Sequence, residues 1–359
     1  MNLPFKDRTM QESLKSTLLD AGIDTDMVSR VLDSGYWLRG WVDPFSGKTW
    51  TSVSDFMYGN KGQSSNFETE KFISHLKGRS TFDPLPTFRR YTVRTVDEIR
   101  AVLSEPYRAR LMNEGRLSFR GQTSEHTFKR HIPNPVRSDK DGREISVLPG
   151  VYRQSADAVY SFSKPYQEQR SFEWLLHKLE PNNTHVYSDS AHAYDIMRVE
   201  QHYATQTAGL DVSFDIGTPV FFSTHHFEKG VDGLAYYRRV PRGEHKGVIY
   251  CFCFRDPPVK AAEYLIKGFD LFKTYRPERV LRQRCGLPLI GDYERNIALT
   301  DLDCIIELDA DFSDEAPVNA KWMFPGISED AFYKQLLEIK DANSDRVPNL
   351  VEYKWARTT

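Results

Sequence analysis

Leu117-Ser118-Phe119-Arg120-Gly121 is the stretch of this chain that decides the fold. Apolar and polar residues alternate along it and a glycine ends it, which is the pattern of a short β-strand. Because successive side chains of a strand point to opposite faces, Leu117 and Phe119 share one face and Arg120 points to the other. We therefore expect Arg120 to leave the apolar core at the end of a strand, beside a glycine that lets another backbone approach closely.

Helices and strands are interleaved on both sides of this strand. Thr95 and Glu98 form a capping box, which predicts a helix over 96–104. Hydrophobic periodicity predicts further elements, which are helices over 154–180, 191–203 and 328–340 and strands over 218–223, 247–254 and 303–308. The spacing is not that of regular strand–helix–strand units, so the pattern favours an α+β domain over a doubly wound sheet.

Residues 1–87 differ from the rest and have the pattern of a small α+β module. Its expected elements are helices over 11–19 and 25–32, a β-hairpin from Trp41 to Trp50 and a helix that opens within 52–57. Pro84 and Pro86 then hold the chain extended, as in a linker. The sequence therefore predicts two domains, 1–87 and 88–359. The first domain either selects a macromolecular target or packs on the second.

The composition is that of a large folded protein with balanced charge. The 359 residues include 48 Lys and Arg and 50 Asp and Glu, a formal net charge of −2, which excludes a uniformly basic nucleic-acid coat and an acidic tail. Hydrophobic residues make up 40% of the chain, enough for a sizeable core. The longest apolar run, 248–254, is too short to span a membrane, and Met1–Lys15 has no signal-peptide pattern. We therefore expect a cytoplasmic protein that does not contact a membrane.

Neither a disulfide framework nor a metal site is expected. Four cysteines do not form a disulfide framework in a chain this long, and no two of them have CxxC spacing. Cys251 and Cys253 share one face of a strand and are interpreted as small core residues. His225 and His226 lack the i, i+4 spacing of helical metal ligands, so we expect no metal there.

Four short segments carry the functional signal. They are 119–122 (FRGQ), 200–222, which opens with EQHY, 279–287, which contains RQRCG, and 324–326 (FPG). In their order and spacing these segments resemble the FRG domain family, over about residues 90–335. The resemblance implies a split, mixed β-sheet with surrounding helices, similar to the fold of ADP-ribosyltransferases. It also implies that NAD binds in the cleft as a co-substrate.

The resemblance assigns Arg120, Gly121 and Gln122 to cofactor binding. NAD carries a pyrophosphate, and an arginine beside a glycine offers a two-pronged donor where backbone can approach closely. The alternative is that Arg120 is a surface arginine paired with a carboxylate.

The second segment supplies further cofactor-binding candidates. By the resemblance, His202 hydrogen-bonds a ribose hydroxyl, Tyr203 stacks on or encloses the nicotinamide, and Ser213 completes the set. The alternative is that His202 is a satisfied, partly buried histidine and that Tyr203 belongs to the core.

Catalysis requires a group that holds the ribose while positive charge develops on it as the bond to nicotinamide breaks. ADP-ribosyltransferases usually place a glutamate there, and Gln283 stands at the matching place of this chain. An amide accepts a hydrogen bond from a 2′-hydroxyl but cannot act as a base. Either the acceptor needs little deprotonation, or Asp211 or Glu278 supplies the carboxylate. The catalytic candidates are thus Arg120, Gln283 and Asp211.

Two basic stretches, 129–143 and 267–284, stand within the neutral chain. Such stretches bind a cofactor pyrophosphate or a nucleic-acid backbone, or they form solvated faces.

The expected function is that of an NAD-dependent mono-ADP-ribosyltransferase acting on a protein or nucleic-acid target. Its expected setting is that of a bacterial or phage toxin or defence factor, with a cognate antitoxin as a further candidate partner. Two alternatives stay open: a catalytically inactive module that binds nucleic acid or a partner protein, and an NAD glycohydrolase. Free nicotinamide without a labelled macromolecule would indicate the hydrolase, and the absence of both would indicate the binding module.

Overall fold

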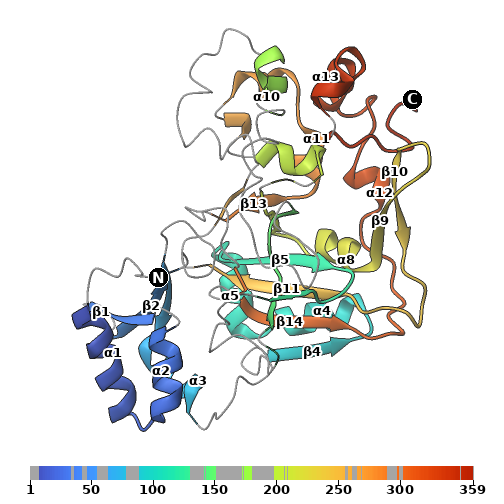
Figure 1. Ribbon diagram of the computed structural model, residues 1–359. Coiled ribbons are helices and arrows are strands. Elements are labelled where there is room, and N and C mark those ends of the chain that lie inside the picture. The colour runs from blue at the N-terminus through green and yellow to red at the C-terminus, as the bar shows by residue number, and fades with distance from the viewer. Residues whose placement is uncertain are drawn as a thin grey trace.

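The chain folds into an α+β structure, which confirms the expected class. The computed structural model (Figure 1) describes residues 8–33, 36–42, 47–54, 64–77, 89–129, 141, 143–150, 172, 174–179, 198–205, 207, 209–254, 258–260, 265–267, 269–288, 297–298, 302–347 and 349–358. Residues 8–77 and residues 89–358 each contain a β-sheet and a hydrophobic core of their own. The expected domain boundary falls within 78–88, outside the described residues, and stays a prediction.

The N-terminal unit combines helices with a three-stranded sheet. Its elements are α1 (Arg8–Asp20), α2 (Thr25–Asp33), β1 (Tyr36–Val42), β2 (Thr49–Ser54), β3 (Ser64–Glu68) and α3 (Thr69–Leu76). The two expected helices and the antiparallel hairpin of β1 and β2 are confirmed. The helix expected within 52–57 is wrong for residues 52–54, because they belong to strand β2, which ends at Ser54. Residues 55–57 lie outside the described residues.

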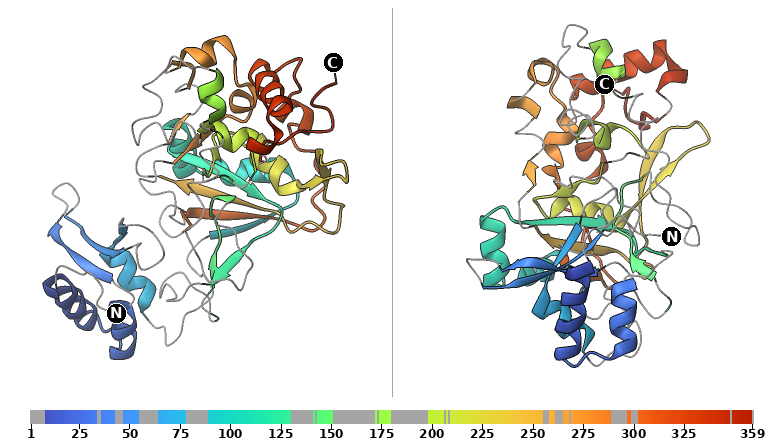
Figure 2. Two further views of the ribbon diagram at one scale, coloured as in Figure 1. Left: turned by 45° about the horizontal axis from the view of Figure 1, so that its top comes forward. Right: turned by 60° about the vertical axis from the view of Figure 1, so that its left-hand side comes forward.

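A seven-stranded mixed sheet organises the larger unit. In order across the sheet, the strands are β12 (Val259–Lys260), β13 (Cys285–Leu287), β8 (Val212–Ser213), β5 (Leu117–Gln122), β11 (Val248–Cys253), β14 (Leu302–Leu308) and β4 (Arg89–Val93). Neighbours are antiparallel except β14 and β4, which are parallel. The strands expected at 117–121, 247–254 and 303–308 are confirmed as β5, β11 and β14, which Figure 2 shows side by side.

The sheet is weakest between β5 and β8. Phe119 and Ser213 form the one residue pair that joins these strands, whereas β5 pairs with β11 along its whole length. On its other edge, β8 continues onto β13. The sheet therefore has a four-stranded part and a three-stranded part that meet at a single residue pair. Arg120 follows Phe119 directly, so it lies at this joint.

Helix α8 (Gly217–Thr224) packs against β5 and β11 (Figure 1), and it replaces the strand expected over 218–223. The expected strand is wrong because a short apolar run that is buried on all sides has no periodicity to distinguish a strand from a helix. Nearly every residue of α8 is buried, as such a run requires.

Two glycines allow α8 to lie directly on the sheet. A Cβ atom on Gly121 would come 1.9 Å from the carbonyl oxygen of Pro219, and one on Gly247 would come 2.3 Å from the carbonyl oxygen of Ser223. Both contacts are with backbone atoms, which cannot swing away as a flexible side chain can. The glycines are therefore required by close packing rather than by their backbone angles.

Helix α4 (Val96–Leu103) begins where the capping box predicts. The Thr95 hydroxyl accepts a hydrogen bond from the backbone N–H of Glu98 at 3.1 Å.

Other helices and strands of the larger unit are α5 (Pro106–Asn113), α10 (Asp270–Thr274), α11 (Glu278–Arg282), α12 (Ala320–Met323), α13 (Ala331–Ala342), the 3₁₀-helix Ser344–Arg346, and the strand pairs β6 (Thr127–Lys129) with β7 (Arg143–Ile145) and β9 (His225–Lys229) with β10 (Ala235–Arg239).

Three expected helices are confirmed in part. The closing helix is α13, which begins later than expected because Asp330 caps it, with a side-chain oxygen that accepts from the backbone N–H of Tyr333 at 2.9 Å. Residues 172, 174–179 and 198–203 are helical, and the rest of the expected helices over 154–180 and 191–203 lies outside the described residues.

We expect Gly121→Ala to destabilise the protein by about 2 kcal/mol or more, because the new methyl group has no space against the Pro219 carbonyl. Gly40→Ala is the control, since its Cβ would meet only Met10 at an ordinary 3.5 Å. Denaturant unfolding measures both changes. Equal stability of the two variants would contradict the packing of α8 on β5.

Candidate functional site

A cavity of about 450 Å³ lies at the joint between β5 and β8. All four motif segments contribute to its lining, although they are spread over more than half of the chain. The expected site residues that line the cavity are Arg120, Gly121, Gln122, His202, Asp211, Ser213 and Gln283. The fold thus brings together nearly the whole set that the sequence indicates.

An ion pair between Arg120 and Asp211 forms one wall of the cavity. The Nη1 atom of Arg120 donates to the Asp211 backbone oxygen and to its Oδ1 atom, both at 2.8 Å, and each side chain is 14% exposed. Burial would raise the pKa of Asp211, but the charge and hydrogen bond of Arg120, together with His202, outweigh burial and hold this pKa below its usual value. Arg120 is therefore paired with a carboxylate, but the pair lies in a cavity and not on an open surface.

Two residues that the sequence analysis does not assign extend this polar wall. The Nε2 atom of Gln201 donates to Asp211 Oδ1 at 3.1 Å, and the Thr207 hydroxyl donates to Gln201 Oε1. Gln201 belongs to the second motif segment, directly before His202, so its position in the motif is the signal that marks it. The carboxylate of Asp211 is thus held in one orientation by two side chains.

A chain of hydrogen bonds connects the thiol of Cys285 to Gln283. Cys285 Sγ lies 2.8 Å from His202 Nε2, and His202 Nδ1 lies 3.0 Å from Gln283 Oε1. The Nε2 atom of Gln283 donates to the backbone oxygen of Met323 at 3.3 Å. Because the glutamine oxygen can only accept, His202 carries its proton on Nδ1 and accepts from the thiol at Nε2.

These hydrogen bonds support the floor of the cavity, and Cys285 is not a nucleophile. Burial raises the pKa of the Cys285 thiol well above its usual range, so the thiolate is not formed, and Cys285 does not line the cavity. Gln283 is 2% exposed and both atoms of its amide are engaged. It lines the cavity as a fixed part of its floor, and its expected role at the ribose stays a prediction. Ser213 secures the same residue, since its hydroxyl donates to the Gln283 backbone oxygen at 3.1 Å.

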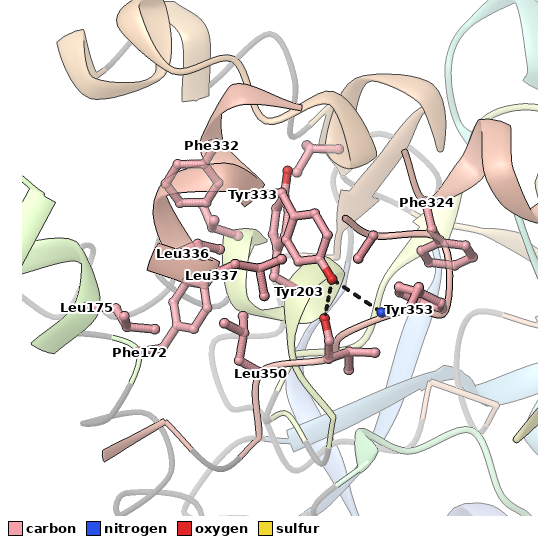
Figure 3. Packing of buried hydrophobic residues seen from close by; sticks show 14 of the residues in the cluster. Phe172, Leu175, Tyr203, Phe324, Phe332, Tyr333, Leu336, Leu337, Leu350 and Tyr353 are labelled. Carbon is pink, nitrogen blue, oxygen red and sulfur yellow. Dashed lines mark hydrogen bonds between the residues drawn. The ribbon is translucent and has the colours of Figure 1, made fainter. Parts of the chain in front are cut away.

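Tyr203 does not line the cavity, which corrects its assignment to the nicotinamide. Its ring is fully buried in the aromatic core shown in Figure 3, and its hydroxyl donates to Asp330 Oδ2 at 2.7 Å. The guanidinium of Arg279 lies over this ring, 4.7 Å from its centroid, and over the ring of Tyr333 at 3.6 Å. The alternative that Tyr203 belongs to the core is the one that the structure shows.

Aromatic rings form a further part of the cavity lining, the aromatic wall. Phe324 stacks on Tyr237 and on Tyr353, with ring centroids 5.0 and 4.8 Å apart. All three residues line the cavity, together with Phe222 and Phe227. Phe222 and Phe324 belong to the second and fourth motif segments, whereas Phe227, Tyr237 and Tyr353 lie in no motif and are brought to the cavity by long-range folding alone.

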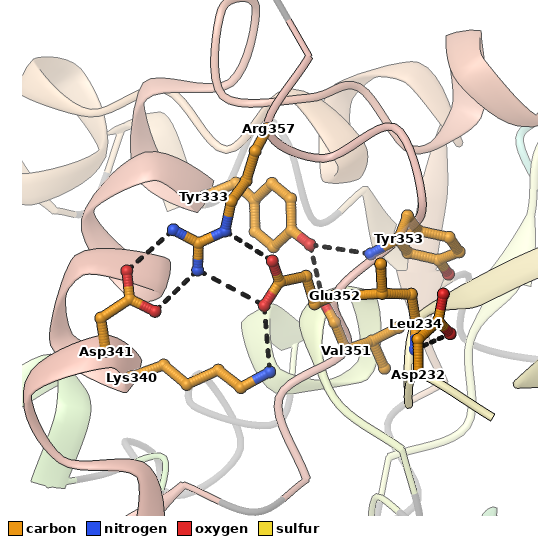
Figure 4. Close-up of polar contacts among 9 residues, drawn as sticks. All are labelled: Asp232, Leu234, Tyr333, Lys340, Asp341, Val351, Glu352, Tyr353 and Arg357. Atoms are coloured by element: carbon orange, nitrogen blue, oxygen red, sulfur yellow. Dashed lines mark hydrogen bonds and ion pairs between the residues drawn. The ribbon is translucent and has the colours of Figure 1, made fainter. Parts of the chain in front are cut away.

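The C-terminal segment 349–358 holds part of this aromatic wall in place (Figure 4). Arg357 donates to both carboxylate oxygens of Asp341 on α13, at 2.8 and 2.7 Å, and to Glu352 at 2.5 Å. The Tyr333 hydroxyl donates to the Val351 backbone oxygen at 2.7 Å. These contacts hold the residues before and after Tyr353 in the sequence, and so they fix Tyr353 at the cavity.

The described residues of the basic stretch over 267–284 include cations that are paired with acids and one that is buried. Among its described residues, several cations are paired with neighbouring acids, as in Lys273 with Asp270, Arg276 with Glu278 and Arg282 with Glu329. Arg279 is buried, and Glu278 does not line the cavity. Most of the other stretch, 129–143, lies outside the described residues.

Within the described part of the chain, no group of three or more His, Cys, Asp or Glu side chains could hold a metal ion. His225 instead stacks on Phe221, with ring centroids 4.4 Å apart. The four cysteines are free thiols. Every helix in the described residues is too short or too polar to cross a membrane.

Comparisons with known proteins give no match. No protein-family model, no curated protein and no solved structure is significantly similar to this chain. The geometry of the cavity is therefore the basis for any statement about function.

We expect Arg279→Ala to destabilise the protein by about 3 kcal/mol, because it empties the centre of the aromatic core and leaves Asp330 without its nearby cation. Arg276→Ala, close by in the chain and mostly exposed, should cost less than about 1 kcal/mol. Chemical denaturation of both variants measures the difference. A loss for Arg279→Ala no larger than that for Arg276→Ala would show that the buried cation is dispensable.

Stability should also fall as the pH drops below about 6.5. Burial lowers the pKa of His202 in the folded state, opposed by Asp211 and by Gln283, so the unfolded chain takes up a proton that the folded chain excludes. Stability from this residue is complete above about pH 6.5 and is lost towards the lower folded pKa. His202→Gln should reduce the pH dependence of unfolding by up to one proton between pH 7.5 and 5.5, measured by urea titrations. An unchanged slope would show that His202 is not excluded from protonation.

Proposed function

We propose that this protein is an NAD-dependent ADP-ribosyltransferase that modifies a macromolecular target. The observation that carries the proposal is the cavity at the sheet joint, whose lining combines a largely buried ion pair with stacked aromatic rings. The two-part sheet, joined by one residue pair, is consistent with the split sheet of an ADP-ribosyltransferase-like fold.

The two walls suit the two kinds of chemistry in a dinucleotide. Flat bases stack on aromatic rings such as Tyr237 and Phe324, and a pyrophosphate binds a guanidinium through paired donors. Arg120 has donors to spare, because Asp211 occupies only its Nη1 atom and its Nε atom has no partner in the structure. In this proposal Arg120 donates to the pyrophosphate while it remains bound to Asp211.

Asp211 is the group that can assist bond cleavage. Among the described residues that line the cavity it is the one carboxylate, and its lowered pKa keeps it ionised at neutral pH. A fixed negative charge stabilises the positive charge that develops on the ribose as nicotinamide leaves. Asp211 therefore takes the role of the carboxylate, and Gln283 supports the floor beneath it.

The acceptor in this proposal is a macromolecule, either protein or nucleic acid, and the N-terminal unit selects it. The separate core of residues 14–76 supports a separate task for that unit. The proposed setting is that of a toxin or defence factor with a cognate antitoxin. Hydrolysis of NAD and a purely binding function are the two competing outcomes of the experiments below.

Arg120→Ala should abolish release of nicotinamide from NAD while it leaves the fold intact, because the pyrophosphate loses its paired donors. Arg120→Lys should restore little activity, since an ammonium group cannot make the two-pronged contact. Chromatography of free nicotinamide and incorporation of label from ³²P-NAD into cell extract measure the two half-reactions. Release without incorporation indicates the hydrolase, and full activity of Arg120→Ala at an unchanged melting temperature rules out the assignment.

Asp211→Asn should slow nicotinamide release by about 10²- to 10³-fold, because the amide keeps the shape but removes the charge. Asp215→Asn is the matched control, since Asp215 lies four residues on, is partly buried and does not line the cavity. The rate of nicotinamide release at saturating NAD is measured for both variants. Equal rates in both variants would place the chemistry elsewhere and favour the binding function.

A further inference from the structure

Gln122 is a buried side chain without a hydrogen-bond partner that lines the cavity. It ends strand β5, is 7% exposed, and both its amide atoms, Oε1 and Nε2, are buried and unpaired in the structure. Arg120 precedes it by two residues, so the two side chains leave the strand on the same face, about 7 Å apart along it.

The backbone from which Gln122 extends is closely packed and paired at the end of strand β5. Gly121 lies against the backbone of Pro219, and residue 122 pairs with Val248 of β11. Folded proteins rarely leave both polar atoms of a buried amide unpaired, because each lost its contact with water on folding. A donor and an acceptor kept unpaired on a fixed strand are ready for a ligand.

We infer that Gln122 recognises a planar edge that presents a hydrogen-bond donor beside an acceptor. The inference rests on the proposed function, since NAD carries two such edges. The carboxamide of nicotinamide has an N–H₂ group beside a carbonyl oxygen, and adenine has its N6 amino group beside N7. An amide pairs with either edge through two hydrogen bonds.

The consequence of this pairing is discrimination between closely similar dinucleotides. A site that is built to hydrogen-bond a ligand rejects an analogue that lacks the matching group, because its own buried polar atoms then stay unpaired. Nicotinic acid adenine dinucleotide replaces the carboxamide donor with a carboxylate oxygen. Nicotinamide hypoxanthine dinucleotide replaces the N6 donor of adenine with an oxygen. Gln122 should therefore disfavour one of the two.

Calorimetric titration of the full-length protein with NAD and both analogues tests the inference, in the wild type and in Gln122→Met. The wild type should bind NAD at least about ten-fold more tightly than one of the two analogues. The analogue that binds more weakly identifies the edge that Gln122 recognises. Gln122→Met should lose about ten- to hundred-fold in NAD affinity and should no longer distinguish that analogue from NAD. Discrimination that persists in Gln122→Met would overturn the inference, as would equal affinity of the wild type for all three ligands.

The melting temperature of the ligand-free protein gives an independent readout. Methionine has a similar volume to glutamine and no unpaired polar atoms, so Gln122→Met should unfold at the same temperature as the wild type or higher. A lower melting temperature would show that the amide has a structural role and would overturn the inference. Failure of the proposed function has a different signature, namely that the wild type binds none of the three dinucleotides, and the inference then fails with it.

Discussion

The buried guanidinium of Arg279 is the interaction on which the rest of the site depends. It is fully buried, lies 3.6 Å from the ring centroid of Tyr333, and donates to the His202 backbone oxygen at 3.3 Å. Burying a charge costs several kcal/mol unless rings, dipoles and a nearby carboxylate compensate for it. Asp330, itself bound to Tyr203, provides that carboxylate.

This constraint explains how segments distant in sequence meet at the cavity. Arg279 lies on α11, whose end carries Gln283, and its contact with His202 fixes the end of the helix over 198–203, which precedes Asp211 in the sequence. The ring of Tyr353 lies 5.0 Å from the guanidinium on another side and faces the cavity. One buried cation thus positions both the polar floor and part of the aromatic wall.

Elements that depend on a local pattern can be predicted from the sequence, whereas elements that depend on distant contacts cannot. The alternation of 117–121 and the capping box at Thr95 predict β5 and α4, because these signals lie within a few residues. The strand expected over 218–223 is a helix, since two glycines elsewhere in the chain make room for it. Arg279 appears in the sequence as one of several basic residues, because arginine is usually exposed and only the folded core shows otherwise.

The central claim is that the cavity at the joint of β5 and β8 binds a dinucleotide, and a crystal structure with a hydrolysis-resistant NAD analogue tests it most directly. We expect electron density with the pyrophosphate at Arg120 and a base against Tyr237 or Phe324. Density for the analogue elsewhere on the protein, with the Arg120–Asp211 wall empty, would contradict the account.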